Sequence, residues 1–308
     1  MTATDETVPT LTEVPMRRGG LARGLVRTGR PKQWIKNVLV LAAPAAAGVL
    51  DDWQSVVRVA IAFVAFSLAA SGTYLLNDAS DVEADGRHPE KRFRPIAAGV
   101  VPVWLARVVG VLLVVAAIAL SATVGGWQLP AVVGFYLLNT TAYTLWLKHI
   151  PVVDLVAVAA GFVLRALGGA AAVGVPVSNW FFIVASLGSL FMDAGNRESE
   201  LRNQAGAGTR RTLEVYSHDY LSYVRAMSSG AVIVAYSLWA FERDAASVAA
   251  VPLFTLSMVP FVCGILRYAM LVDAGSGEAP EDLVLHDRAL KVFGAVLVVL
   301  IAVGVYAG

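Results

Sequence analysis

Long apolar runs, separated by charged or Pro- and Gly-rich stretches, dominate the chain. A helix needs about 20 apolar residues to cross the hydrocarbon core of a bilayer, and nine runs approach that length, at residues 34–50, 59–76, 103–124, 129–147, 152–173, 180–192, 227–241, 251–271 and 290–307. The sixth and seventh runs are short. The pattern predicts an all-α integral membrane protein, a bundle of about nine transmembrane helices. We expect residues 1–28 to form a flexible tail and residues 29–308 a single transmembrane domain.

Lys and Arg residues are distributed unevenly among the segments that separate the apolar runs. Most of them lie at residues 17–36, 87–94, 148, 197–211 and 288–291, whereas the intervening segments carry little beyond Arg58 and Arg243. Because cytoplasmic loops are enriched in Lys and Arg, this alternation predicts a multi-pass protein of the plasma membrane with a cytoplasmic N-terminus. The two longest loops, at about residues 78–102 and 193–224, then lie on the cytoplasmic side, where we expect the active site.

Composition excludes several classes of protein. Of 308 residues, 57% are apolar and 15% are charged, which is outside the range of soluble domains. The net charge of +1 indicates no nucleic-acid partner, and the lone Cys263 excludes an internal disulfide. The sequence has no Walker loop, nucleophile elbow or His-Glu-x-x-His helix, so nucleotide, serine or zinc hydrolysis has no support.

Acidic residues recur at helical spacing after the second run. Asn77, Asp81 and Asp85 are four residues apart, so on a helix they share one face, with Asp78 beside the first. Stacked carboxylates repel one another unless a cation lies between them, and hard oxygen ligands suit Mg²⁺, which also binds substrate phosphates. The spacing favours a magnesium diphosphate site. A solvated acidic helix end is the alternative, but it does not explain the regular spacing.

Two basic clusters accompany this acidic face. Lys91, Arg92 and Arg94 follow it directly and favour phosphate contact, although an ordinary cytoplasmic anchor is the alternative. Lys32 and Lys36 open the first run, where α-helical spacing would place them on the same face. They could hold either a lipid phosphate or a substrate phosphate.

A second acidic cluster ends the sixth run. Asp193, Asn196 and Glu200 can line one helical face and could frame a single cavity with the first cluster. The alternative is local surface pairing of Arg197 with Glu198 or Glu200.

Two further cations, Lys148 and Arg165, fall inside or near the runs. Arg165 lies midway along a run and is costly in lipid, so it should face the bundle interior and hold a carboxylate, phosphate or carbonyl group. Asp154 is one candidate partner.

The motif NDASDVEAD, followed by KRFRPIAAG, resembles the aspartate-rich signature of the UbiA superfamily of intramembrane prenyltransferases. The resemblance implies a nine-helix bundle that uses Mg²⁺ and a diphosphate, and a homo-oligomer, a trimer by analogy. RPKQWIKNVLVLAAP, SLAASGTYLLNDASDVEADGRHPEKRFRPIAAGVVP, LWAFERD and PEDLVLHDR are similar to one branch of the superfamily, over about residues 28–308. That branch transfers a 5-phosphoribosyl group from phosphoribosyl diphosphate (PRPP) to decaprenyl phosphate, a polyprenyl phosphate, with release of diphosphate, in arabinan cell-wall precursor synthesis.

The resemblance also implies roles for individual residues. Asn77, Asp81 and Asp85 would be catalytic and hold Mg²⁺ and the diphosphate. The expected substrate-binding residues are Lys32, Gln33, Lys36, Asp78, Lys91, Arg92, Arg94, Lys148, Arg165, Asn196, Arg197 and Glu200. The chain departs from that branch where Asn196 and Glu198 replace a Lys and a Tyr, and where Asp193 replaces an apolar residue. These changes make the second cluster more like the second acidic motif of ordinary UbiA prenyltransferases.

Two other functions stay open. A prenyltransferase would use both acidic clusters to move a polyprenyl chain from its diphosphate to a small acceptor. A transporter or lipid-binding protein would explain a buried Arg165, but not acidic and basic loops paired on one side.

Overall fold

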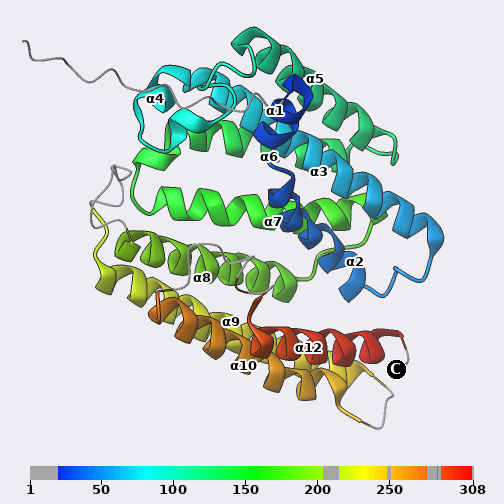
Figure 1. The fold of residues 1–308 in the computed structure, drawn as a ribbon. Coiled ribbons are helices and arrows are strands. Elements are labelled where there is room, and N and C mark those ends of the chain that lie inside the picture. Colours follow the sequence, from blue (N-terminus) through cyan, green and yellow to red (C-terminus); the bar gives the residue numbers. More distant parts are fainter. Residues whose placement is uncertain (1–19, 204–214, 248–250, 276–282, 284–285, 307–308) are drawn as a thin grey trace, which may run out of the picture.

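The computed structural model describes residues 20–203, 215–247, 251–275, 283 and 286–306 (Figure 1). Helices account for nearly all of the regular structure in this part of the chain, and no strand occurs in it. The helices are α1 (Leu21–Thr28), η1 (Pro31–Leu41), α2 (Ala42–Ala46), α3 (Trp53–Ser80), α4 (Val82–Arg87), η2 (Lys91–Phe93), α5 (Val103–Ala122), α6 (Gln128–Leu145), η3 (Leu147–His149), α7 (Val153–Val173), α8 (Asn179–Asn203), α9 (His218–Ala246), α10 (Leu253–Asp273) and α12 (Arg288–Tyr306). The all-α prediction is confirmed, and each predicted run falls on a helical segment.

The long helices lie side by side and form a layered bundle (Figure 1). Helix α3 packs against α5, α6 against α7, α7 against α8, α8 against α9, and α10 against α12. Six helices of the described chain, α3, α5, α7, α9, α10 and α12, are long and apolar enough to cross a membrane. The architecture is that of a multi-pass membrane protein.

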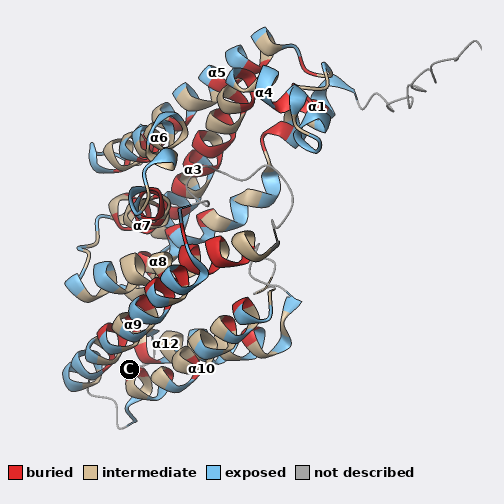
Figure 2. Cartoon of the chain, turned by 90° about the vertical axis from the view of Figure 1, so that its left-hand side faces the viewer, coloured by how far each residue is buried: buried red, intermediate tan, exposed pale blue. Residues whose placement is uncertain are grey.

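Helices α3 and α7 form the centre of the bundle, and they have the largest buried share of these six helices (Figure 2). Two adjacent glycines of α7 allow close packing. A Cβ atom on Gly169 would lie 1.8 Å from the carbonyl oxygen of Val40 in η1, and one on Gly168 would lie 2.3 Å from the ring of Phe66 in α3. Phe66 also meets the Tyr136 ring edge-on, with the ring centroids 5.2 Å apart. Both η1 and α3 therefore sit directly on the α7 backbone.

The first apolar run differs from the prediction, because it is a 3₁₀-helix followed by the short helix α2 rather than one α-helix. A 3₁₀-helix has three residues per turn, so Trp34, Asn37 and Val40 share one side of η1, where Asn37 and Val40 are buried and Trp34 is 36% exposed. The Trp34 indole donates to the Ser71 hydroxyl at 3.0 Å, and the Asn37 amide donates to Ser67 at 2.9 Å. These side-chain bonds tie η1 to α3.

The boundary predicted for the N-terminal tail is also wrong at residues 21–28, which form α1. Gly24 in this helix is buried, and a Cβ atom there would lie 2.8 Å from the Val101 side chain. Residues 1–19 of the predicted tail lie outside the described residues.

The loop predicted at residues 193–224 is much shorter in the structure, because α8 continues to Asn203 and α9 begins at His218. Charged residues at the end of α8 are buried by partners on neighbouring helices, so they continue the helix instead of ending it. The two short apolar runs thus belong to two of the longest helices.

Candidate active site

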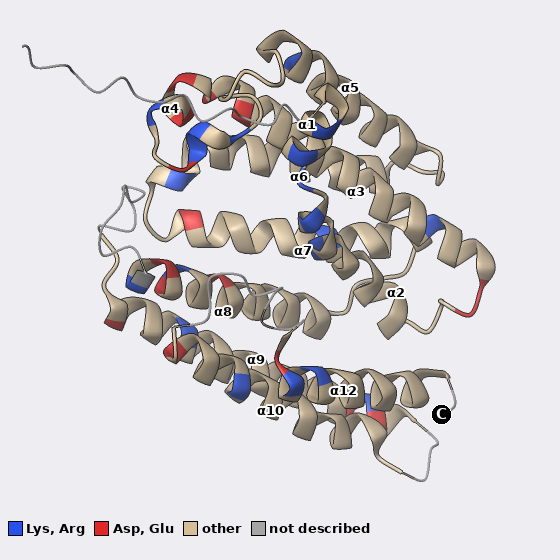
Figure 3. Ribbon diagram, viewed as in Figure 1, with Lys and Arg blue, Asp and Glu red and all other residues tan. Residues whose placement is uncertain are grey.

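Charged residues gather at one end of the bundle, around α4, the start of α7 and the end of α8 (Figure 3). This end carries both acidic clusters and the loop that contains η2. The predicted site residues of those segments therefore share one side of the protein.

The acidic face of Asn77, Asp81 and Asp85 continues across the junction of two helices. Helix α3 ends at Ser80, yet the amide of Asp81 donates to the carbonyl of Asn77 at 2.9 Å and that of Asp85 to the carbonyl of Asp81 at 2.8 Å. These are α-helical hydrogen bonds, so the backbone keeps helical spacing between these positions across the junction, and the shared face of the three side chains stays a prediction. Asp85 is buried, and Asp81 is half-buried.

Arginines bind the carboxylates beside this face. Arg94 donates to Asp85 at 2.8 Å and to Asp78 at 3.1 Å. Arg30 donates to the same Asp78 oxygen at 2.9 Å, and its guanidinium lies 4.6 Å from the centre of the Tyr74 ring. Asp78 is only 3% exposed, so its charge needs these partners. The structure brings Asp78, Asp85 and Arg94 together as ion pairs and adds Arg30.

The sequence analysis did not predict Arg30 as a site residue, although its position between a glycine and a proline indicates a turn. It directly precedes Pro31 of η1, after Gly29, and has a left-handed backbone with φ of 51°. This turn separates α1 from η1 and places the Arg30 side chain against the end of α3.

A cavity of about 230 Å³ opens beside these ion pairs. Its lining joins α1, the end of α3 and the segment after α4, and contains three arginines and two acids: Arg27, Thr28, Arg30, Asp78, Glu90, Phe93, Arg94 and Pro95. An excess of arginine donors in a concave site suits an anion that carries phosphate groups.

The remaining predicted cations lie on η2, η3 and η1. Lys91 and Arg92 in η2 are exposed, whereas Lys148 in η3 is half-buried. In η1, Lys32 is exposed while Gln33 and Lys36 are half-buried. The prediction that Lys32 and Lys36 share a face is wrong, because four residues in a 3₁₀-helix correspond to about 120° of rotation beyond a full turn.

The second cluster centres on Arg197, which is 3% exposed and not a surface residue. It donates to Glu200 at 3.2 Å and to the Tyr143 hydroxyl at 2.9 Å, and its Nε atom lies 3.9 Å from the Asp154 carboxylate. Asp193 is buried, and Asn196 is half-buried on the same helix. Arg197 thus joins the end of α8 to the start of α7. The alternative of pairing with Glu200 is confirmed, but Arg197 is buried and the pair is not a surface pair.

Arg165 lies in the bundle interior, as predicted, and is 7% exposed. It donates to the Asn37 side chain at 2.7 Å, to the Gly161 carbonyl at 2.8 Å and to the Tyr136 hydroxyl at 2.9 Å. Asp154 is not its partner, because that carboxylate faces Arg197 and Tyr216. Arg165 therefore braces η1 against α6 and α7.

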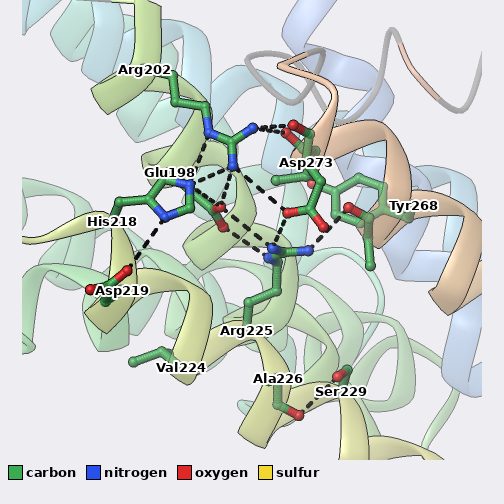
Figure 4. A network of polar contacts seen from close by, with 12 residues as sticks. Glu198, Arg202, His218, Asp219, Val224, Arg225, Ala226, Ser229, Tyr268 and Asp273 are labelled. Atoms are coloured by element: carbon green, nitrogen blue, oxygen red, sulfur yellow. Dashed lines mark hydrogen bonds and ion pairs between the residues drawn. The ribbon is translucent and has the colours of Figure 1, made fainter.

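A buried ion network lies behind the second cluster and was also missed (Figure 4). Glu198 in α8 is fully buried. Its carboxylate accepts hydrogen bonds from Arg225 of α9 at 2.9 Å and from Arg202 at 3.2 Å, and Nε2 of His218 lies 2.9 Å from it. Arg225 also donates to Asp273 of α10 at 2.6 Å. The network fixes the end of α8, and hence Arg197, relative to α9 and α10.

The UbiA prenyltransferase family model matches residues 38–286 of this chain. The chain belongs to the UbiA prenyltransferase family. A decaprenyl-phosphate phosphoribosyltransferase of Corynebacterium glutamicum is 47% identical over 93% of this chain and 88% of its own length. The protein of that name from Mycobacterium tuberculosis is 46% identical, covering 94% of this chain and 96% of its own length.

Solved structures of UbiA proteins share the fold. A UbiA homolog from Archaeoglobus fulgidus bound to GPP and Mg²⁺ superimposes with a TM-score of 0.69 at 16% identity, over 92% of this chain and 100% of that chain. A structure of digeranylgeranylglyceryl phosphate synthase gives 0.64 at 13% identity, over 93% of this chain and 99% of that chain.

The UbiA family implies a divalent metal, and the predicted ligands fit one. The Oδ1 atom of Asn77 is buried and has no hydrogen-bond partner among the described residues. Asp81 and Asp85 follow at four-residue intervals, and the donor atoms of all three side chains are hard oxygens. The described chain contains no group of three or more His, Cys, Asp or Glu side chains placed to hold a metal. An amide and two carboxylates nevertheless suit Mg²⁺, which usually takes few protein ligands and completes its shell with water and substrate phosphate.

Proposed function

We propose that this UbiA-family protein transfers a 5-phosphoribosyl group from PRPP to decaprenyl phosphate, releasing diphosphate, in arabinan cell-wall precursor synthesis. The observation that carries the proposal is the cavity at the charged end, where Arg30 and Arg94 meet buried carboxylates. The names of relatives 44–47% identical over 93–94% of the chain supply the reaction class.

The donor binds at this charged end. Arg30 and Arg94 line the cavity and form hydrogen bonds to the phosphate oxygens of PRPP. Lys91 and Arg92 on η2 are exposed and attract PRPP from solvent. Asn77, Asp81 and Asp85 hold Mg²⁺, which when bound would neutralise charge on the departing diphosphate. Arg197 contacts a further phosphate oxygen of the donor from the end of α8.

The acceptor phosphate enters from the membrane side, next to Lys32, Gln33 and Lys36 on η1. The bond between C1 of the ribose and the diphosphate oxygen breaks, and diphosphate leaves with the electron pair. A new bond forms between C1 and an oxygen of the acceptor phosphate. Since a phosphate is already ionised near neutral pH, no general base is required, and attack opposite the leaving group converts the α-linked donor to a β-linked product.

The position of the protein in the cell is part of the proposal. The charged end faces the cytoplasm from the plasma membrane, supported by the alternation of Lys and Arg along the sequence. PRPP is a charged, water-soluble donor, so its site belongs on that side. A homotrimer, implied by the resemblance, is the proposed assembly.

Prenyl transfer is the second candidate, favoured by the family to which the chain belongs. It would need the second acidic cluster to bind additional metal. Glu200 of that cluster is paired with Arg197 at 3.2 Å, as Asp85 of the first cluster is with Arg94 at 2.8 Å, so metal binding would have to displace an arginine at either cluster.

A transfer assay tests the proposal. Purified protein in lipid is incubated with Mg²⁺, PRPP labelled in the ribose and decaprenyl phosphate, and the organic extract is counted. We expect label in the lipid phase only when Mg²⁺ and the acceptor are present. Folded protein that leaves all label in water, but transfers a labelled prenyl group from a prenyl diphosphate, would replace this proposal with the second candidate.

A further inference from the structure

Tyr216 lies just before α9 and has a rigidly packed ring. The residue is 6% exposed and packs with Leu155 of α7 and Leu221 of α9. Its ring also stacks on Tyr220, with centroids 5.7 Å apart and planes at 5°. Packing therefore fixes where the hydroxyl points.

The Tyr216 hydroxyl joins two groups at the start of α7. It accepts a hydrogen bond from the Val152 amide at 2.5 Å and donates one to Oδ1 of Asp154 at 2.5 Å. Val152 has φ of 70°, a strained conformation for a β-branched residue, and in this conformation its N–H meets the hydroxyl. Burial and the bond to Asp154 raise the pKa of Tyr216 above its usual range, so the hydroxyl remains a donor.

Asp154 connects Tyr216 to Arg197. Its Oδ2 atom lies 3.9 Å from Nε of Arg197, which is beyond hydrogen-bond distance. That Nε atom is buried and has no hydrogen-bond partner among the described residues. Arg197 uses its two terminal nitrogens for Glu200 and Tyr143. Its Nε–H is thus a donor left over for an anion.

We propose that Tyr216 is a positioning residue for phosphate recognition by Arg197, acting through Asp154; this rests on the proposed function. By engaging Oδ1, Tyr216 holds the carboxylate away from Nε of Arg197. Without the hydroxyl, the buried Asp154 is free to close the 3.9 Å gap to that Nε–H. Arg197 is then consumed by an internal ion pair and binds the phosphate of the donor less well.

The test compares Tyr216→Phe with Tyr220→Phe in the full chain in lipid nanodiscs. Tyr216→Phe keeps the packed ring and removes only the hydroxyl, whereas Tyr220 belongs to the same stack and is 37% exposed. Binding of labelled PRPP with Mg²⁺ is measured without acceptor, and kcat and KM are measured with it. We expect Tyr216→Phe to weaken PRPP binding and raise KM about tenfold, with kcat within about twofold of wild type, and Tyr220→Phe to change neither.

A double-mutant cycle with Asp154→Asn separates positioning from a merely structural role. An amide has no charge to close on Arg197, so Tyr216→Phe should have little effect on PRPP binding in the Asp154→Asn background. A full tenfold effect in that background, or no effect in wild type, would overturn the inference while leaving phosphoribosyl transfer intact. Absence of PRPP binding by the wild-type protein would instead contradict the proposed phosphoribosyl transfer. If Tyr216→Phe fails to fold, the same cycle with Tyr216→His decides the matter.

Discussion

The Glu198→Gln substitution should destabilise the protein strongly, because it removes the fully buried charge at the centre of an ion network (Figure 4). Glu198 accepts from Arg225 at 2.9 and 3.4 Å and from Arg202 at 3.2 Å, and His218 lies 2.9 Å away. Gln keeps the shape of the side chain but leaves both guanidinium groups without their buried counter-charge. Asp273 remains to compensate Arg225, although it is 60% exposed.

Breaking a buried ion pair by removing one partner costs about 3–5 kcal/mol. At about 2 °C per kcal/mol, as for the larger single domains, the melting temperature should fall by about 6–10 °C. Thermal unfolding in nanodiscs, followed by tryptophan fluorescence, measures this change. Asp219→Asn is the matched control, because Asp219 is fully exposed and lies 4.0 Å from the same His218. A Glu198→Gln protein that melts within about 2 °C of the Asp219→Asn control would refute the reasoning.

Three further predictions concern the acidic face, the helix packing and the pH dependence. Asp81→Ala should reduce phosphoribosyl transfer at least about 100-fold while the protein melts normally; wild-type activity would exclude Asp81 from the site. Gly169→Ala places a Cβ atom 1.8 Å from a carbonyl oxygen of η1 and should cost about 1–3 kcal/mol, whereas Gly134→Ala, with open space around it, should be tolerated in the same melting assay. The hydrogen bond from Arg267 lowers the pKa of Asp287 to about 2 from 3.8. A lowered pKa stabilises the fold above the unfolded value and loses this effect as pH falls through the folded pKa. Asp287→Asn should therefore lower the melting temperature more at pH 6 than at pH 2, and equal melting differences at both would contradict this.

The parts of the fold that depend on local spacing could be predicted from the sequence. The thickness of a bilayer sets the length of an apolar run, so the runs located the long helices. The four-residue spacing of Asn77, Asp81 and Asp85 is likewise local, and α-helical backbone hydrogen bonds join the three positions although α3 ends and α4 begins between them.

Contacts between distant segments could not be predicted in this way. Glu198 is charged and was expected near a surface, but Arg225, 27 residues later, buries it. Arg30 binds Asp78 across 48 residues, and Tyr216 binds Asp154 across 62. The 3₁₀ form of η1 also depends on long-range contacts, since Arg165 holds Asn37 from α7. Each error has the same physical origin, which is a polar partner brought by the tertiary fold.

Transfer of the 5-phosphate of PRPP to the lipid is the central claim, and double labelling tests it most directly. Two PRPP samples, one labelled in the 5-phosphate and one in the terminal phosphate of the diphosphate, are incubated with the protein, Mg²⁺ and decaprenyl phosphate. We predict that the first label moves to the organic phase and that the second remains in water as diphosphate. Terminal-phosphate label in the lipid, or 5-phosphate label confined to water with folded protein, would contradict phosphoribosyl transfer.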